Sequence, residues 1–296
     1  MWIIYVLLNP ILHACSNILD NYLTNKVFTH KVSLIFYASF LNMVFLPLVF
    51  LLTGLPNIPT HASLPIFLGL ALINILYLYP YYKALESNDT SNVVALFALG
   101  QLFVPILAYF MVNEVLTLQQ YIGIGIVLIS SLAVSLDKHV SIKINQSFWW
   151  MLLCTFILSF EYVLYKLLFE SVNWVTGFTW PVVFSFALAL LFLLHHQHKK
   201  HIVGDWKKFA QNVYIFGLEE LTTFLGIATG TYALSIAPVS VVKAIISTES
   251  IFVLLYAVIL RKRFPHLFKE DIDRRSVSKK IVLFVCIIFG LFLVLR

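Results

Sequence analysis

Ionisable side chains interrupt several apolar runs of this sequence. The acids are Asp20, Glu161, Glu219, Glu220 and Glu249, and the bases are Lys166 and Lys243. If these runs cross a bilayer, a charge at its centre costs roughly 2.5–3.5 kcal/mol on insertion scales. Each such residue therefore needs a partner or a function. Because the acids outnumber the bases, the pattern favours binding of cationic or zwitterionic solutes, and it suits proton exchange.

Polar residues recur beside these charges at helical spacing. Asn17 and Asp20 lie on a polar stripe with His13, which either lines a site or forms interhelical hydrogen bonds. Ser240, Lys243, Ser247 and Ser250 fall on one helix face, which aligns with Gln101 and its neighbours by an internal repeat described below. The candidate residues for substrate binding or coupling are Asn17, Asp20, Tyr77, Tyr81, Gln101, Glu161, Tyr165, Glu219, Thr223, Lys243 and Ser247.

Two interpretations stay open for most of the charged candidates. Glu161 either pairs with Lys243 or Lys166, or it binds substrate or a proton. Glu219 and Glu220 are adjacent, so at most one of them is expected to face a central cavity squarely. Their mutual repulsion would let one of them hold a proton and act as a coupling site. Glu249 falls on another face of its helix and is interpreted as an interhelical partner.

Other chemistries lack their sequence signatures. There is no Walker loop, nucleophile elbow, HExxH motif or glycine-rich dinucleotide motif. His195, His196, His198 and His201 are interpreted as part of a solvated basic loop rather than a metal site. Cys15, Cys154 and Cys286 lie in three separate apolar runs without metal-ligand spacing. We therefore expect no catalytic residue, no metal and no cofactor.

The composition is that of a membrane protein. Of 296 residues, 60% are hydrophobic and 11% are charged, against about 25% charged residues in soluble domains. No cleavable signal peptide is evident. The formal charge of +6 resides in loops beside the apolar runs, which argues against a nucleic-acid partner and for contact with lipid.

Ten apolar runs have a length that suits a membrane span. They are Trp2–Leu23, Val32–Leu52, Leu64–Tyr82, Asn92–Val112, Gln119–Leu136, Phe148–Phe169, Thr176–Leu194, Asn212–Leu234, Val239–Leu260 and Lys280–Leu295. A polar link, Asp137–Asn145, separates the first five from the last five. The predicted fold is therefore an all-α membrane protein with ten transmembrane helices.

The two halves share an internal repeat. Ala84–Glu114 aligns with Ala233–Arg263 at a shift of 149 positions (233 − 84), with a polar turn, a Ser-x-Val motif and a long apolar run in the same order. Five helices in each half would give the halves opposite orientations. We therefore expect an inverted repeat of five plus five helices, with units 1–140 and 141–296 and a site between them.

A known family shares this pattern. The stretch from Ser91 to Leu136 resembles the end of the EamA repeat of the drug/metabolite transporter superfamily, with a mid-helix Pro105, a Glu-x-Leu-Thr motif at Glu114 and a final helix that opens on Ile122-Gly123. The second half keeps Ala-Pro-Val-Ser-Val-Val, but Arg263 replaces the glutamate. The resemblance implies that helices 1, 3, 4, 6, 8 and 9 line a cavity and that helices 5 and 10 could support a homodimer.

The orientation of the termini is ambiguous. Most of the twenty basic residues follow predicted helices 1, 3, 5, 7 and 9, so the positive-inside rule places both termini outside. The resemblance implies that the protein lies in a bacterial inner membrane with both termini on the cytoplasmic side. Taken together, the sequence predicts a secondary transporter, proton-coupled or exchange-driven, for an amino-acid-like or cationic metabolite. The alternatives are an anionic or sugar-type substrate, or a membrane-embedded enzyme that modifies lipid.

Overall fold

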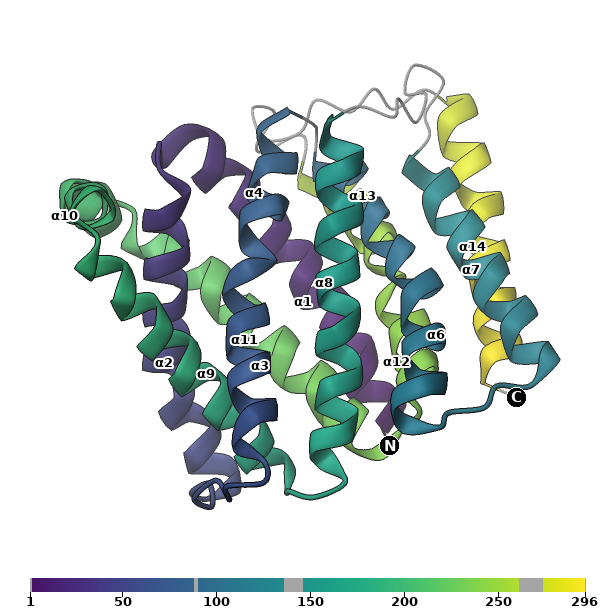
Figure 1. Ribbon diagram of the computed structural model, residues 1–296. Helices are drawn as coiled ribbons and strands as arrows, with labels where there is room; N and C mark the ends of the chain where they lie inside the picture. The colour runs from purple at the N-terminus through teal and green to yellow at the C-terminus, as the bar shows by residue number, and fades with distance from the viewer. Residues whose placement is uncertain (1, 88–89, 136–145, 261–273, 296) are drawn as a thin grey trace.

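The computed structural model describes residues 2–87, 90–135, 146–260 and 274–295, and every regular element in these ranges is a helix (Figure 1). The first half contains α1 (Trp2–Tyr22), the π-helical η1 (Leu23–Val27), α2 (Lys31–Thr53), α3 (Leu64–Leu76), α4 (Leu78–Ser87), α5 (Thr90–Leu96), η2 (Phe97–Leu99), α6 (Gly100–Val112) and α7 (Leu118–Ser135). The second half contains α8 (Gln146–Phe169), α9 (Trp174–Leu190), η3 (Leu191–Leu194), α10 (His196–Gln211), α11 (Val213–Ile236), α12 (Val239–Ile246), α13 (Glu249–Leu260) and α14 (Arg274–Val294).

Helices long and apolar enough to cross a membrane number seven among the described residues. They are Trp2–Val27, Lys31–Thr53, Leu64–Glu86, Val93–Val112, Gln146–Phe169, Trp174–Leu194 and Val239–Tyr256. Two shorter apolar helices, Leu118–Ala133 and Val282–Val294, accompany them. The chain is thus an integral, multi-pass membrane protein.

Several predicted runs are interrupted where a continuous helix was expected. A turn at Tyr77 separates α3 from α4, and the short η2 separates α5 from α6. Ser247 and Thr248 separate α12 from α13. The link Asp137–Asn145 lies outside the described residues.

The prediction of a loop around the four histidines is wrong. His195 is the residue before α10, and His196, His198 and His201 lie on this helix. The helix buries Ile202, Asp205 and Phe209, a spacing that places these side chains on one face. Because the segment is rich in His and Lys, its short amphipathic pattern was interpreted as a solvated loop.

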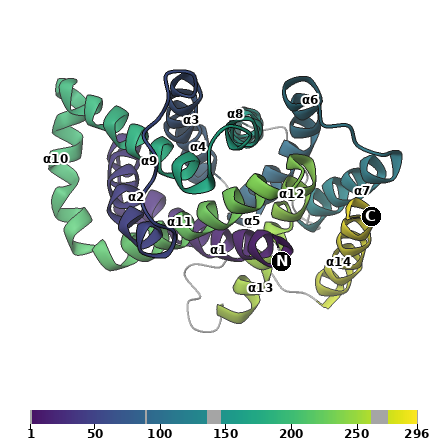
Figure 2. The ribbon, with the colours of Figure 1, turned by 90° about the horizontal axis from the view of Figure 1, so that it is seen from below.

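The packing of the long helices fixes the interior. α1 lies along α11, and α7 lies along α14 at one edge of the bundle (Figures 1 and 2). Both ends of the chain lie at the same end of the bundle (Figure 1).

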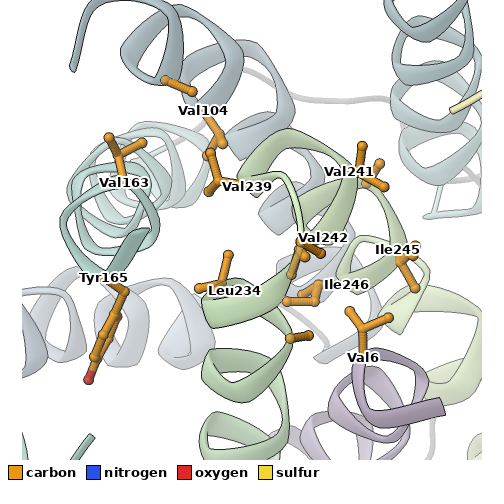
Figure 3. Packing of buried hydrophobic residues seen from close by; sticks show 14 of the residues in the cluster. Val6, Val104, Val163, Tyr165, Leu234, Val239, Val241, Val242, Ile245 and Ile246 are labelled. Carbon is orange, nitrogen blue, oxygen red and sulfur yellow. The ribbon is translucent and has the colours of Figure 1, made fainter. Parts of the chain in front are cut away.

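The short helix α12 sits in the largest hydrophobic cluster. Its Val239, Val242 and Ile246 pack with Val104 of α6 and Val163 of α8 (Figure 3). All eight residues of α12 are buried. The helix next to the candidate site therefore contacts protein rather than lipid on all sides.

Candidate functional site

A cavity of about 150 Å³ lies between helices of the two halves. Its charged lining side chains are Asp20, Glu161, Glu219, Glu220, Glu249 and Lys243, from α1, α8, α11, α12 and α13. The five acids thus face the same space with one lysine. The lining also contains His13, Asn9, Asn42, Asn74 and several tyrosines.

A hydrogen-bond network connects α1, α4 and α13 on one wall of the cavity. The hydroxyl of Tyr81 lies 2.5 Å from Asn17 Oδ1 and 3.1 Å from Asp20 Oδ2, and it donates to these oxygens. The amide nitrogen of Asn17 donates to Glu249 Oε1. Because buried polar groups are costly when they lack partners, this chain of bonds fixes the side-chain positions of two sequence-predicted residues, Asn17 and Asp20.

The neighbouring acids Glu219 and Glu220 are both buried and both line the cavity. Asn42 Nδ2 donates to Glu220 Oε2 at 2.7 Å, and Thr223 Oγ1 donates to Glu219 Oε1 at 3.0 Å. The other carboxylate oxygen of Glu219 has no hydrogen-bond partner among the described residues. Both members of the pair thus contribute to the lining, and which of them faces the cavity squarely stays a prediction.

Glu161 lies on α8 and faces the cavity. Its carboxylate forms no ion pair within 4.0 Å in the described part of the chain. Lys166, one of its two suggested partners, instead donates to Leu234 O at 3.3 Å and Ala237 O at 2.9 Å. Those carbonyls lie at the C-terminal end of α11, where a cation is favourable.

Lys243, the other suggested partner, is 4% exposed and lines the cavity. Its ammonium nitrogen lies 4.9 Å from the centroid of the Tyr162 ring, in cation–π geometry. No acidic oxygen lies within 4.0 Å of this nitrogen among the described residues. Gly100 makes room for this side chain, since a Cβ at that position would lie 2.8 Å from Lys243 Cε.

The break between α12 and α13 suits the charges beside it. Lys243 lies in the last turn of α12, and Glu249 lies in the first turn of α13. A helix C-terminus favours a cation and an N-terminus favours an anion. The interrupted helix therefore supports one charge of each sign next to the cavity.

The structure brings nine of the predicted residues to the cavity. These are Asn17, Asp20, Tyr77, Tyr81, Glu161, Tyr165, Glu219, Thr223 and Lys243. Gln101 and Ser247 are buried but do not line it. Ser247 Oγ donates to Lys243 O at 2.9 Å. The helix breaks at η2 and at Ser247 interrupt the faces on which these two residues were placed.

Several lining residues were absent from the predicted site, among them two acids and two amides. Glu220 and Glu249 were noticed in the sequence but assigned elsewhere, and Asn9 and Asn42 were not singled out. Asn9 Nδ2 donates to Gly226 O of α11 at 2.8 Å. An asparagine in an apolar run is a signal that could have identified both amides, because such residues need a partner within the membrane.

Glu114, known so far only as a motif residue, contacts the N-terminus of α12. Its carboxylate oxygens accept from Val239 N at 2.8 Å and from Ser240 N at 3.0 Å. The first amides of a helix lack intrahelical partners, and a carboxylate is favourable there. Asn113, in the left-handed region at φ 52°, ends α6 and turns the chain toward this contact. The motif in the first half thus anchors the helix that carries Lys243.

The described residues hold no group of three or more His, Cys, Asp or Glu side chains that could bind a metal ion. A charged cavity among apolar helices is the kind of site found in membrane proteins that bind small polar solutes. The comparison with protein families indicates the same class, that of membrane transporters of small solutes. Residues 1–136 match the EamA-like transporter family. This match confirms the resemblance to that family, which belongs to the drug/metabolite transporter superfamily.

No curated protein matches the chain. A solved structure titled "Crystal structure of protein" is 13% identical, covers 97% of this chain and 94% of its own, and superposes with a TM-score of 0.63. At this identity the likeness shows a shared fold alone.

Proposed function

We propose that the protein is a secondary transporter that moves a small amino-acid-like or cationic metabolite by alternating access. The observation that carries the proposal is the charge of the cavity, where five carboxylates and one ammonium group surround about 150 Å³. An acidic lining attracts a cation, and the single Lys243 supplies a contact for a substrate carboxylate. The volume suits a metabolite rather than a polymer or a lipid.

A duplicated architecture supports alternating access. α5 and α12 begin 149 positions apart (239 − 90), and α6 and α13 also begin 149 positions apart (249 − 100). Under this repeat α1 corresponds to α8, α2 to α9, α3 to α11 and α6 to α13. The contacts between the halves follow the same correspondence: α6 packs on α8 and α13 packs on α1, while α3 packs on α9 and α11 packs on α2. These correspondences support two units, 1–140 and 141–296, as an inverted repeat of five plus five spans. α7, α11 and α14 would complete the set of ten.

The energy for transport would come from a gradient. The sequence has no ATP-binding motif, and Glu161 is a cavity carboxylate that forms no ion pair within the described ranges. A carboxylate in that position can hold a proton in one state and a cationic group in another. Exchange of one metabolite for another would use the same site without a proton.

The location would be a bacterial inner membrane, as the superfamily resemblance implies. The basic residues that follow alternate spans would face the cytoplasm if the positive-inside rule decides the orientation. Both termini would then be external, and a reporter fused after Arg296 measures this directly.

The test begins with a screen for ligands that raise the melting temperature of the purified protein, using cationic, zwitterionic, anionic and sugar metabolites. The best ligand is then used for uptake into proteoliposomes with and without a pH gradient. We expect Glu161→Gln to abolish uptake driven by the gradient while the protein remains folded. The matched control is Glu170→Gln, because Glu170 is exposed and lies just beyond the end of α8. Wild-type rates in Glu161→Gln would refute the proposed coupling role.

A second candidate is a transporter of anionic metabolites. It is favoured by Lys243, whose ammonium group has a tyrosine ring but no acid within 4.0 Å among the described residues. Stabilisation by anionic ligands alone, lost in Lys243→Gln, would favour this candidate over the first. A lipid-modifying enzyme has less support, because none of the four histidines around α10 lines the cavity.

A further inference from the structure

The helix α10 differs from the apolar helices in direction and in composition. In Figure 1 it is viewed nearly along its axis, while the long helices run from top to bottom. Figure 2 shows it lengthwise at the edge of the bundle. It links α9 and η3 to α11 and packs on α2. Its position across the helix bundle is that of a helix in the plane of a membrane surface.

The face that α10 turns to the protein is well fixed. Ile202, Asp205 and Phe209 are buried, and the Tyr37 hydroxyl of α2 donates to Ile202 O at 2.7 Å. Asp205 accepts from Lys208 at 2.7 Å and lies 3.3 Å from the ring of His30. These contacts attach the helix to the N-terminal end of α2 and use its one acidic side chain.

A second face of α10 is apolar and uncovered. Val203 and Trp206 are 62% and 58% exposed, and Ala210 continues the same stripe. The Trp206 ring lies 5.5 Å from that of Phe209 and 6.2 Å from that of Tyr37, measured between centroids. One side of the indole is therefore supported by protein. Tryptophan in this setting is typical of the boundary between acyl chains and headgroups.

A third strip, beside the apolar one, is basic. Lys200 and Lys207 are seven residues apart and thus share a face, whereas Lys199, four residues before Val203, lies at the N-terminal end of the apolar stripe. All three are exposed. No acidic oxygen lies within 4.0 Å of their ammonium groups in the ranges that the structure describes. The order around the helix is protein contact, apolar stripe and basic strip, which is the profile of a helix at a negatively charged membrane surface.

We propose that α10 is a binding surface for anionic phospholipid headgroups, with Lys199, Lys200 and Lys207 as the headgroup contacts and Trp206 as the anchor in the acyl region. The partner is a lipid rather than a protein, because the charge is uniformly positive and lies beside an apolar stripe at the level of the ends of the spans. The proposal depends on the membrane location of the chain and not on its transport function.

Trp206 provides a reporter for the test. The full-length protein is reconstituted in phosphatidylcholine bilayers that contain brominated phosphatidylglycerol or, in parallel, brominated phosphatidylcholine. The signal of Trp206 is the difference between the wild type and Trp206→Phe, since the chain has six tryptophans. We expect stronger quenching by phosphatidylglycerol at equal mole fraction, and a preference that falls at high salt.

Substitution of the lysines separates a local site from a general charge effect. In the variant Lys199→Gln/Lys200→Gln/Lys207→Gln the preference should fall severalfold, since each lysine near an anionic surface contributes up to roughly fivefold. The control Lys26→Gln removes another exposed basic side chain, outside α10, and should leave the preference unchanged. If the triple variant does not fold, Lys207→Gln and the salt series on the wild type replace it.

Three results would overturn the proposal. Equal quenching by the two lipids would show that α10 does not distinguish headgroups. A preference that survives the lysine substitutions would place the headgroup contact elsewhere. Absence of quenching by either lipid would show that Trp206 is exposed to water or buried against a protein partner.

Discussion

The cap that Glu114 provides to α12 can be tested by its removal. Glu114→Ala deprives the amides of Val239 and Ser240 of acceptors at 2.8 and 3.0 Å. Hydrogen bonds to charged groups contribute about 1.5–3 kcal/mol each. Because Glu114 is half-buried and water can replace part of the contact, we take a total of about 2 kcal/mol, which is close to the upper range for N-terminal caps.

The expected effect is local. A loss of about 2 kcal/mol increases the population in which the start of α12 is open by about 30-fold. Hydrogen exchange followed by mass spectrometry measures this opening on peptides that cover Val239–Ile246. Glu114→Gln should have an intermediate effect, because an amide oxygen keeps one acceptor but loses the charge. Glu170→Gln serves as the control for a general change of charge.

Two results would contradict a local role for Glu114. If α12 keeps its wild-type protection in Glu114→Ala, the contact does not stabilise the helix. If exchange increases over the whole protein to the same extent, the residue supports global stability and not the position of Lys243.

Two further predictions concern packing and the surface. Gly230→Ala should lower the melting temperature, with a cost of about 1–3 kcal/mol, because its Cβ would lie 2.5 Å from Asn9 Nδ2; Gly217→Ala, which has open space, is the control. Burial raises the pKa of Asp205, but the hydrogen bonds with Lys208 and His30 and the charge of Lys208 outweigh it and lower the pKa overall. The stabilisation of α10 should therefore be present above about pH 4 and be lost as the pH falls through the lowered folded-state value, and the Trp206 emission of Asp205→Asn should lack this acid transition.

Much of the helix layout could be predicted from the sequence, because lipid as a solvent imposes long apolar runs. The start of α3 at Leu64 and the start of α12 at Val239 match the predicted boundaries. The interruptions could not be predicted. No proline or glycine occurs near Ser247 and Thr248 to mark a break in the helix. The break depends on packing around α12.

Part of the candidate site could be predicted, because a charged side chain in a membrane span is costly in free energy and is therefore expected to have a function. Asp20, Glu161 and Glu219 stand out because charges are rare in apolar runs, and all three line the cavity. The faces of interrupted helices could not be assigned from spacing, which explains the positions of Gln101 and Ser247. Helical periodicity relates side chains only within one continuous helix.

Gly100 gives the cavity a direction. Under the proposed repeat it is the counterpart of Glu249, yet it borders Lys243 and makes room for that side chain. Under the same repeat, Val94 of the first half is the counterpart of Lys243. At these two positions the charges would come from the second half alone. A solute that enters from one side of the membrane would therefore meet them in a different order from a solute that enters from the other side.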